Sequence, residues 1–138
     1  MRAQLVARLR AEAGVIAAAG IVSARPAIDW IERQSDSDAA FPAATLQIIS
    51  PGREYDHDGP TGLGMPRVRI ECFGKSQSDA VVLADAIRDA IEPSATVSGI
   101  RFHRAKLLFE RDFNPEDLGG GLKIFRNLRD YQIPATSE

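Results

Sequence analysis

The sequence has one cysteine, two histidines and no long apolar run. Cys72 cannot form an intrachain disulfide, and its place in an alternating apolar stretch predicts a small buried hydrophobe. The longest apolar run, residues 14–22, is mostly alanine and too short to span a bilayer. Near the start, Arg10 and Glu12 interrupt any signal-peptide core. We therefore expect a protein made and assembled in the cytoplasm, with no membrane partner.

Neither sign of charge dominates, because 17 basic residues stand against 19 acidic residues. A dedicated nucleic-acid-binding domain normally carries a basic excess for phosphate contacts, which this chain lacks. The balance leaves room for a protein past which DNA moves without being held. A length of 138 residues with 44% hydrophobic content predicts one globular domain, spanning 1–138, around a single core.

The clearest strand pattern lies at residues 67–73. Val68, Ile70 and Cys72 fall on one face, and the residues between them are charged. This period of two predicts a half-buried strand. The strand is expected to end at Gly74.

A helix is expected directly after this strand. Ser76, with Asp79 three residues later, is typical of a helix start, because the serine oxygen can accept a free backbone N–H. Apolar residues then recur at helical spacing, at Ala80, Leu83, Ala84, Ile87 and Ile91. The spacing predicts a helix that packs one stripe against the sheet.

The other segments predict a second helix and further strands. Residues 2–13 predict an amphipathic helix with Arg8 among its outward-facing side chains. Strands are expected at 28–31, 44–50, 100–111 (covered on both sides, or bent by a bulge around Arg104) and 122–133, with a turn at 94–99 and a frayed end at 134–138. This order predicts an α+β fold: an antiparallel sheet of four or five strands with two helices packed on one face.

Two long links separate these strands. Residues 53–64 are charged and glycine-rich, which predicts a hairpin extended by a projecting loop. Residues 112–121 contain three consecutive glycines, which predicts a flexible loop. Both links are candidate contact surfaces.

The residues most suggestive of chemistry are Asp56, His57 and Asp58. Neighbouring residues on an extended segment point in alternate directions, so three in a row seldom converge on one ion. A solvated turn is the favoured interpretation, and a metal or acid–base site is the alternative. His103, with no second histidine at ligand spacing, is expected at a surface or edge. We predict a protein that is not an enzyme, with no catalytic set, metal or other cofactor.

Basic residues recur on the predicted strands, interleaved with apolar ones. They form either a solvated outer sheet face or a charged interface or channel wall. They are Arg67, Arg69, Arg101, Arg104, Lys106, Lys123, Arg126 and Arg129.

The stretch from Phe41 to Ile91 resembles the tail-completion, or tail-terminator, family of long-tailed bacteriophages and gene transfer agents. The resemblance covers most of the chain in layout, but the closing strand, with Arg126, Asn127, Arg129 and Asp130, is more polar than the family pattern. Besides Phe41-Pro42, it is carried by Asp58-Gly59-Pro60-x-Gly62-Leu63, by Arg67-Val68-Arg69-Ile70-Glu71-Cys72-Phe73, and by Ala80 with Leu83-Ala84-Asp85-Ala86-Ile87-Arg88.

The resemblance implies a structural role in virion assembly. Six copies would form a homohexameric ring at the head–tail junction of a phage, prophage-derived or gene-transfer particle. The ring would cap the tail tube, end its elongation and join it to the head connector, while DNA passes through without specific binding. Its partners would be other copies of itself, the tail tube protein and the connector or stopper protein.

Ring formation needs contacts between different faces of each subunit, which the two long links could supply. The candidate interface residues are Arg53, Glu54, Tyr55, Asp56, His57, Asp58, Leu63, Asn114, Glu116, Asp117 and Leu118. Two alternatives stay open. One is a head–tail stopper or neck component, and the other is a small metal-binding enzyme that uses Asp56, His57 and Asp58.

Overall fold

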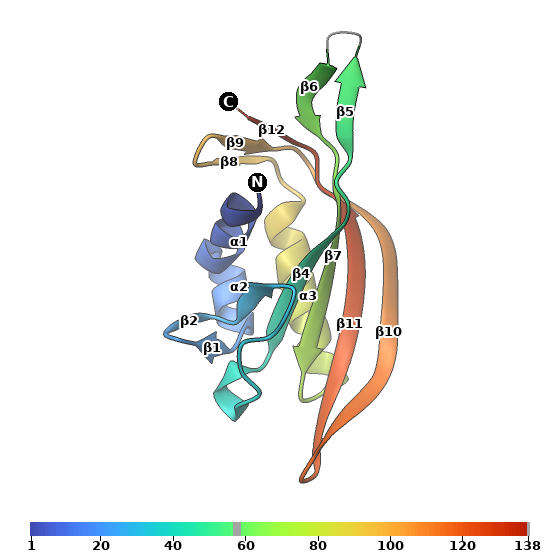
Figure 1. Ribbon diagram of the computed structural model, residues 1–138. Helices are drawn as coiled ribbons and strands as arrows, with labels where there is room; N and C mark the ends of the chain where they lie inside the picture. The colour runs from blue at the N-terminus through green and yellow to red at the C-terminus, as the bar shows by residue number, and fades with distance from the viewer. Residues whose placement is uncertain (57–58, 138) are drawn as a thin grey trace.

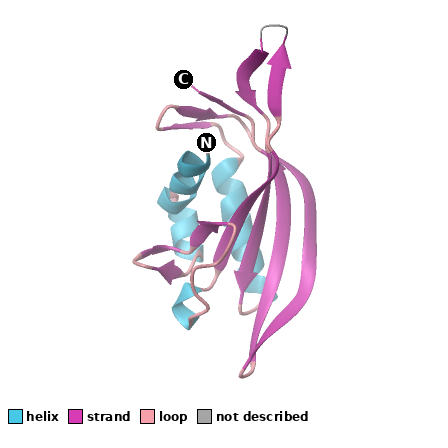
Figure 2. Ribbon diagram, in the orientation of Figure 1, coloured by secondary structure: helices cyan, strands magenta, loops and turns pink. Residues whose placement is uncertain are grey.

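The computed structural model describes residues 1–56 and 59–137. These residues form three α-helices, two five-stranded sheets and a two-stranded ribbon. Figure 1 shows the helices together on one face of the long sheet, and Figure 2 separates the helical layer from the strands by colour. The predicted α+β class, with helices on one face of a five-stranded sheet, is confirmed.

The helical layer contains three α-helices where the sequence predicted two. The N-terminal segment is divided at Glu12, whose extended backbone (φ -76°, ψ 124°) interrupts the helix. The helices are α1 (Arg2–Ala11), α2 (Ala13–Ala18) and α3 (Gln77–Ile91).

The main sheet has the strand order β10-β11-β7-β4-β3. Its strands are β3 (Ile28–Trp30), β4 (Ala43–Ser50), β7 (Arg67–Gly74), β10 (Lys106–Gly119) and β11 (Leu122–Gln132). The prediction of a wholly antiparallel sheet is wrong at one edge, where β3 pairs parallel to β4. The intervening residues, which include the 3-10 helix η1 (Asp38–Ala40), make a link long enough for a parallel connection.

The core lies between α3 and the helix-facing side of the main sheet. Val68, Ile70 and Cys72 of β7 are at most 2% exposed, and Leu83 and Ile87 of α3 are fully buried. These residues belong to one apolar cluster, as the alternating and helical patterns predicted. Burial also raises the pKa of the Cys72 thiol to about 12, so the thiol stays protonated near neutral pH.

The junction between β7 and α3 follows its sequence signals. The Asp79 N–H donates to the Ser76 Oγ at 3.2 Å, which caps the first turn of the helix. Gly74 is needed because a Cβ at this position would lie 2.7 Å from the Ala80 nitrogen. Strand and helix therefore meet at close range.

A second sheet has the order β5-β6-β12-β9-β8. Its strands are β5 (Arg53–Asp56), β6 (Gly59–Gly64), β8 (Ala95–Val97), β9 (Ile100–Phe102) and β12 (Ala135–Ser137), and the separate ribbon pairs β1 (Ile21–Val22) with β2 (Arg25–Pro26). The chain passes between the two sheets at Pro51, Pro66 and Pro134, between β4 and β5, β6 and β7, and β11 and β12. Backbone hydrogen bonds continue across this line of breaks, from Ile133 N–H to Pro66 O at 3.0 Å and from His103 N–H to Pro134 O at 2.8 Å.

Three predictions about the second half of the chain are wrong. Residues 94–99 contain the strand β8 at Ala95–Val97, and only Ser98 and Gly99 form the hairpin turn to β9. The predicted strand at 100–111 is divided into β9 and β10 by a break at 103–105, where a bulge was one expectation. The predicted frayed end contains β12, which pairs with β6 on one side and β9 on the other.

The predicted flexible loop at 112–121 is instead the outer half of β10 and its turn. Gly119, Gly120 and Gly121 have φ values of 88°, 60° and 81°. Positive φ at successive residues is what a tight hairpin turn requires, so these glycines form the turn that joins β10 to β11.

Arg8 is buried, not outward-facing as predicted. Its Nη2 donates to the carbonyl oxygens of Ala90 at 2.7 Å and Pro93 at 2.5 Å. These carbonyls lie at the C-terminal end of α3, where backbone acceptors lack helical partners and a cation is favoured. Arg8 therefore ties α1 to the end of α3.

Replacement of Leu83 by Ala tests the packing of α3. Because the Leu83 side chain is fully buried, we expect Leu83→Ala to lower the free energy of unfolding by about 2–5 kcal/mol. The neighbouring Val82→Ala is the control, since Val82 is 55% exposed and its loss should change stability by less than about 0.5 kcal/mol. Urea denaturation measures both, and equal effects of the two variants would contradict this packing.

Candidate assembly surfaces

One group of predicted interface residues lies on the β5–β6 hairpin. Arg53 to Asp56 form β5, and Leu63 lies on β6. His57 and Asp58 lie outside the described residues. The backbone pairs antiparallel, with Tyr55 opposite Pro60 and Asp56 opposite Gly59. Figure 1 shows this hairpin projecting beyond the other strands of the second sheet at one end of the molecule, which agrees with the predicted projecting link.

The other group lies on the outer half of β10. Asn114, Glu116 and Asp117 are exposed, whereas Leu118 is partly buried against the apolar cluster that contains Phe73 and Ile124. The Asp117 carboxylate accepts the Gly119 N–H at 2.8 Å and so supports the hairpin turn. Figure 1 shows the tip of this hairpin at the opposite end of the molecule from β5 and β6. The two groups therefore form two separate surfaces.

A row of charges crosses the sheet face that points away from the helices. Asp130 of β11 is fully buried and accepts hydrogen bonds from Arg67 and Arg69 of β7, with shortest distances of 2.7 Å and 2.9 Å. Burial by itself would raise the pKa of Asp130, but the hydrogen bonds from Arg69 and Arg67 outweigh it and hold this pKa below its ordinary value of 3.8. The charges are thus largely matched within the chain.

Aromatic side chains border this row on the β10 side. Phe109, directly opposite Asp130, is 38% exposed. The Arg126 guanidinium lies 4.5 Å from the Phe113 ring centre, and that of Arg111 lies 4.9 Å from it. The outer face thus combines ion pairs with exposed aromatic rings, a composition typical of protein contact surfaces.

A second polar network lies on the helix-facing side of β11. The Arg129 Nη2 donates to Asp85 of α3 at 2.8 Å, and its Nε donates to Glu110 of β10 at 2.9 Å. Burial opposes the charge on Arg129, but the hydrogen bond to Asp85 and the nearby Glu110 carboxylate raise its pKa. The network joins α3 to β10 across β11, and it gives Arg129 of the closing strand its partners.

The basic residues predicted on one sheet face are therefore divided between different environments. Arg67, Arg69 and Arg126 lie on the outer face, where Arg126 is 3.5 Å from Glu71. Arg129 is buried on the other side, and Arg104 lies in the break between β9 and β10. Arg126 and Arg129 are three residues apart on β11, so the alternation of the strand places them on opposite faces, whereas the position of Arg104 depends on the break between β9 and β10.

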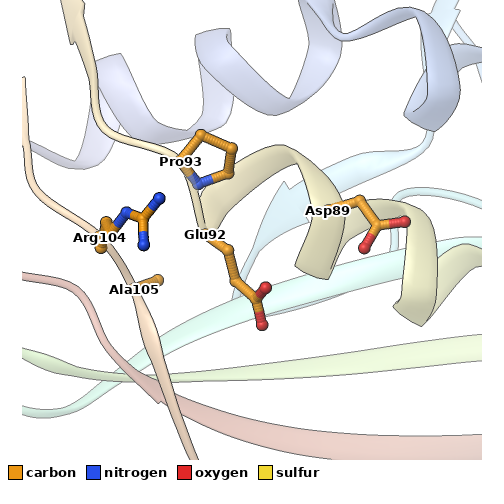
Figure 3. A pocket seen from close by; sticks show the side chains of 5 residues that line it. All are labelled: Asp89, Glu92, Pro93, Arg104 and Ala105. Atoms are coloured by element: carbon orange, nitrogen blue, oxygen red, sulfur yellow. The ribbon is translucent and has the colours of Figure 1, made fainter.

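A shallow hollow of about 300 Å³ opens between the end of α3 and the segment that precedes β10. Figure 3 shows the side chains that line it, with the carboxylates of Asp89 and Glu92 from the helix side and the guanidinium of Arg104 from the opposite segment. Pro93 and Ala105 complete the lining, which contains no serine, cysteine or histidine. The hollow can pair charges with a protein surface, but its lining offers no nucleophile paired with a base.

The described residues contain no arrangement of side chains that supports the metal hypothesis. Within 1–56 and 59–137, no three His, Cys, Asp or Glu side chains are grouped to hold an ion. His103 is partly buried, with its Nε2 3.3 Å from the Thr136 Oγ1 beside β12. No helix in the described part of the chain is long and apolar enough to cross a membrane.

Comparison with known proteins shows a similarity of fold. No protein-family model and no curated protein matches the sequence. The fold is similar to that of a chain in a solved structure described as the virion of a native gene transfer agent particle, with a TM-score of 0.70 and 16% sequence identity. The similarity covers 99% of this chain and 95% of the other. At this identity the similarity shows a shared fold over the whole chain.

The ion pairs of Asp130 predict a pH-dependent loss of stability. A carboxyl group whose pKa is depressed by folding stabilises the protein above its unfolded pKa, and this contribution is lost as the pH falls through the folded pKa. We expect Asp130→Asn to lower the free energy of unfolding by about 1–3 kcal/mol at neutral pH. The difference from wild type should shrink as the pH falls below about 4.

Denaturant titrations at several pH values measure this difference. Glu116→Gln, which removes an exposed carboxylate from β10, serves as the control and should have little effect at any pH. A penalty for Asp130→Asn that stays constant down to about pH 2 would show that its ionisation does not stabilise the fold.

Proposed function

We propose that this chain is a structural virion protein of the tail-terminator type. In this role, six copies form a ring that caps the tail tube, stops its elongation and joins it to the head connector. The observation that carries the proposal is the fold similarity to a chain of a gene transfer agent virion, which extends over 99% of this chain. The sequence resemblance between Phe41 and Ile91 points independently to the same class of particle.

The geometry of the two hairpins supports a position between two different partners. The β5–β6 hairpin and the tip of the β10–β11 hairpin lie at opposite ends of the molecule (Figure 1). A ring of such subunits would present the β5–β6 hairpins on one face and the tips of the β10–β11 hairpins on the other. One set would meet the tail tube protein and the other the connector or stopper protein.

The charge of the chain is compatible with DNA passing through such a ring. The formal net charge is -2, and the basic residues Arg67 and Arg69 are already paired with Asp130. Each free basic side chain that held a phosphate would strengthen DNA binding and so retard passage. Matched charges would therefore favour transit over binding.

Deletion of the coding sequence from the host element tests the proposed function. Without a terminator, tube subunits continue to add, so we expect overlong tails that lack heads in electron micrographs of the particles. Wild-type protein supplied in trans should restore tails of normal length. Tails of normal length attached to DNA-filled heads would contradict the proposal.

The same experiment separates the alternatives. Loss of a stopper or neck component would give heads that leak DNA beside tails of normal length. His57→Ala, supplied in trans, addresses the metal-binding enzyme. Full restoration by this variant agrees with a structural role, whereas stoichiometric metal in the purified wild-type protein that is lost from a folded His57→Ala protein would favour the metal-site alternative.

A further inference from the structure

Large exposed apolar side chains lie at the two opposite edges of the main sheet. On the β10 edge, Leu107, Leu108 and Phe109 are consecutive and 39%, 42% and 38% exposed. At the β3 edge, Ile31 follows the last residue of the strand and is 67% exposed. Monomeric proteins seldom leave such side chains grouped on a strand edge without a partner.

The exposed apolar residues of the two edges lie at the same level along the strands, as the strand pairing shows. Trp30 pairs with Leu46, Leu46 with Ile70, and the row continues through Arg129 to Glu110 on β10. Ile31 is one residue beyond Trp30, and Phe109 is one residue from Glu110, at the two ends of the adjacent row. All copies in a closed ring lie at one height along its axis, so contacting edges must present their complementary residues at the same level.

The backbone at Ile31 adds a separate observation. Its φ is 72°, in the left-handed region that a β-branched side chain rarely adopts. The Ile31 N–H donates to Leu46 O at 2.9 Å, which holds the backbone in place at the end of β3. This conformation is costly for isoleucine, and such strain in native proteins tends to mark functional positions.

The charges of the two edges are also complementary. The edge strand β10 carries four carboxylates and two basic side chains. Apart from the buried Arg8, residues 2–30, which form α1, α2 and the strands up to β3, carry three arginines and two carboxylates. Figure 1 shows these N-terminal elements and β10 on opposite sides of the molecule. An acidic side of one copy can therefore face a basic side of another.

We propose that the β10 edge of one copy binds the β3 edge of a second copy, with Ile31 packed against Leu108 and its neighbours. The proposal rests on the proposed ring and specifies the surfaces that build it. Because the two surfaces differ, the contact repeats head to tail, and the matched rows place the ring axis roughly along the strands. The two hairpins then point to opposite faces of the ring.

A mixing experiment with two variants tests this contact. Leu108→Asp blocks one edge, and Ile31→Asp blocks the other, because each places a carboxylate in an apolar contact. We expect each variant alone to be monomeric by native mass spectrometry under conditions in which the wild-type chain assembles. An equimolar mixture should form a complex of two copies and nothing larger, since it retains one intact pair of edges.

The control is Val82→Asp, because Val82 is 55% exposed on α3, which belongs to neither edge strand, and this variant should assemble like wild type. Circular dichroism verifies that all three variants are folded. Assembly of either edge variant alone, a mixture that stays monomeric, or a wild-type chain that never self-associates would overturn the proposed contact. Capping of purified tail tubes by wild-type protein, measured separately, distinguishes failure of this contact from failure of the proposed function.

Discussion

The packing of α3 against β7 is the constraint on which the rest of this structure depends. Leu83 and Ile87 meet Val68, Ile70 and Cys72 in one buried cluster, so this face of the sheet is closed to partners. The outer face and the β10 edge are left without a helical cover among the described residues, and the chain stabilises them in other ways. Asp130 is buried between Arg67 and Arg69, and Arg129 joins β10 to Asp85 of α3. The helices therefore cover one face of the sheet only, and the long edge strand β10 lies outside that cover.

The connection between the two sheets places a hairpin at each end of the molecule. Proline occurs at three of the passages between the sheets, and proline cannot donate the backbone hydrogen bond that a continuous central strand needs. The sheet is therefore interrupted there, while hydrogen bonds such as that from Ile133 N–H to Pro66 O keep the two parts joined. Beyond the breaks, the β5–β6 hairpin extends one way, and the β10–β11 hairpin extends the other (Figure 1). This arrangement suits a subunit that contacts different partners above and below a ring.

Local patterns in the sequence predicted β7 and α3 well, because their alternation, cap and apolar stripe depend on neighbouring residues. Features set by distant contacts could not be predicted. The pairing of β3 with β4 depends on the path of the link, and burial of Arg8 depends on α3, which follows much later in the chain. The three glycines Gly119 to Gly121 predicted a flexible loop, but consecutive glycines also serve tight turns that need positive φ, and this is their role here. The two predicted interface groups lie at opposite ends of the molecule, and Ile31 was missed because one exposed isoleucine makes no pattern. The three consecutive apolar residues at 107–109 break the alternation of polar and apolar side chains, and this was the sequence signal that could have predicted an exposed apolar edge on β10.

We propose that this chain is the subunit of the ring that closes the tail tube at the head–tail junction. Cryo-electron microscopy of purified particles from the host element tests it most directly, because the fold of each subunit can be fitted into density at the junction. The account predicts six copies in one ring between the last tube layer and the connector, with a hairpin set facing each neighbour. Particles in which this fold is absent from the junction, or lies in another part of the virion, would contradict it.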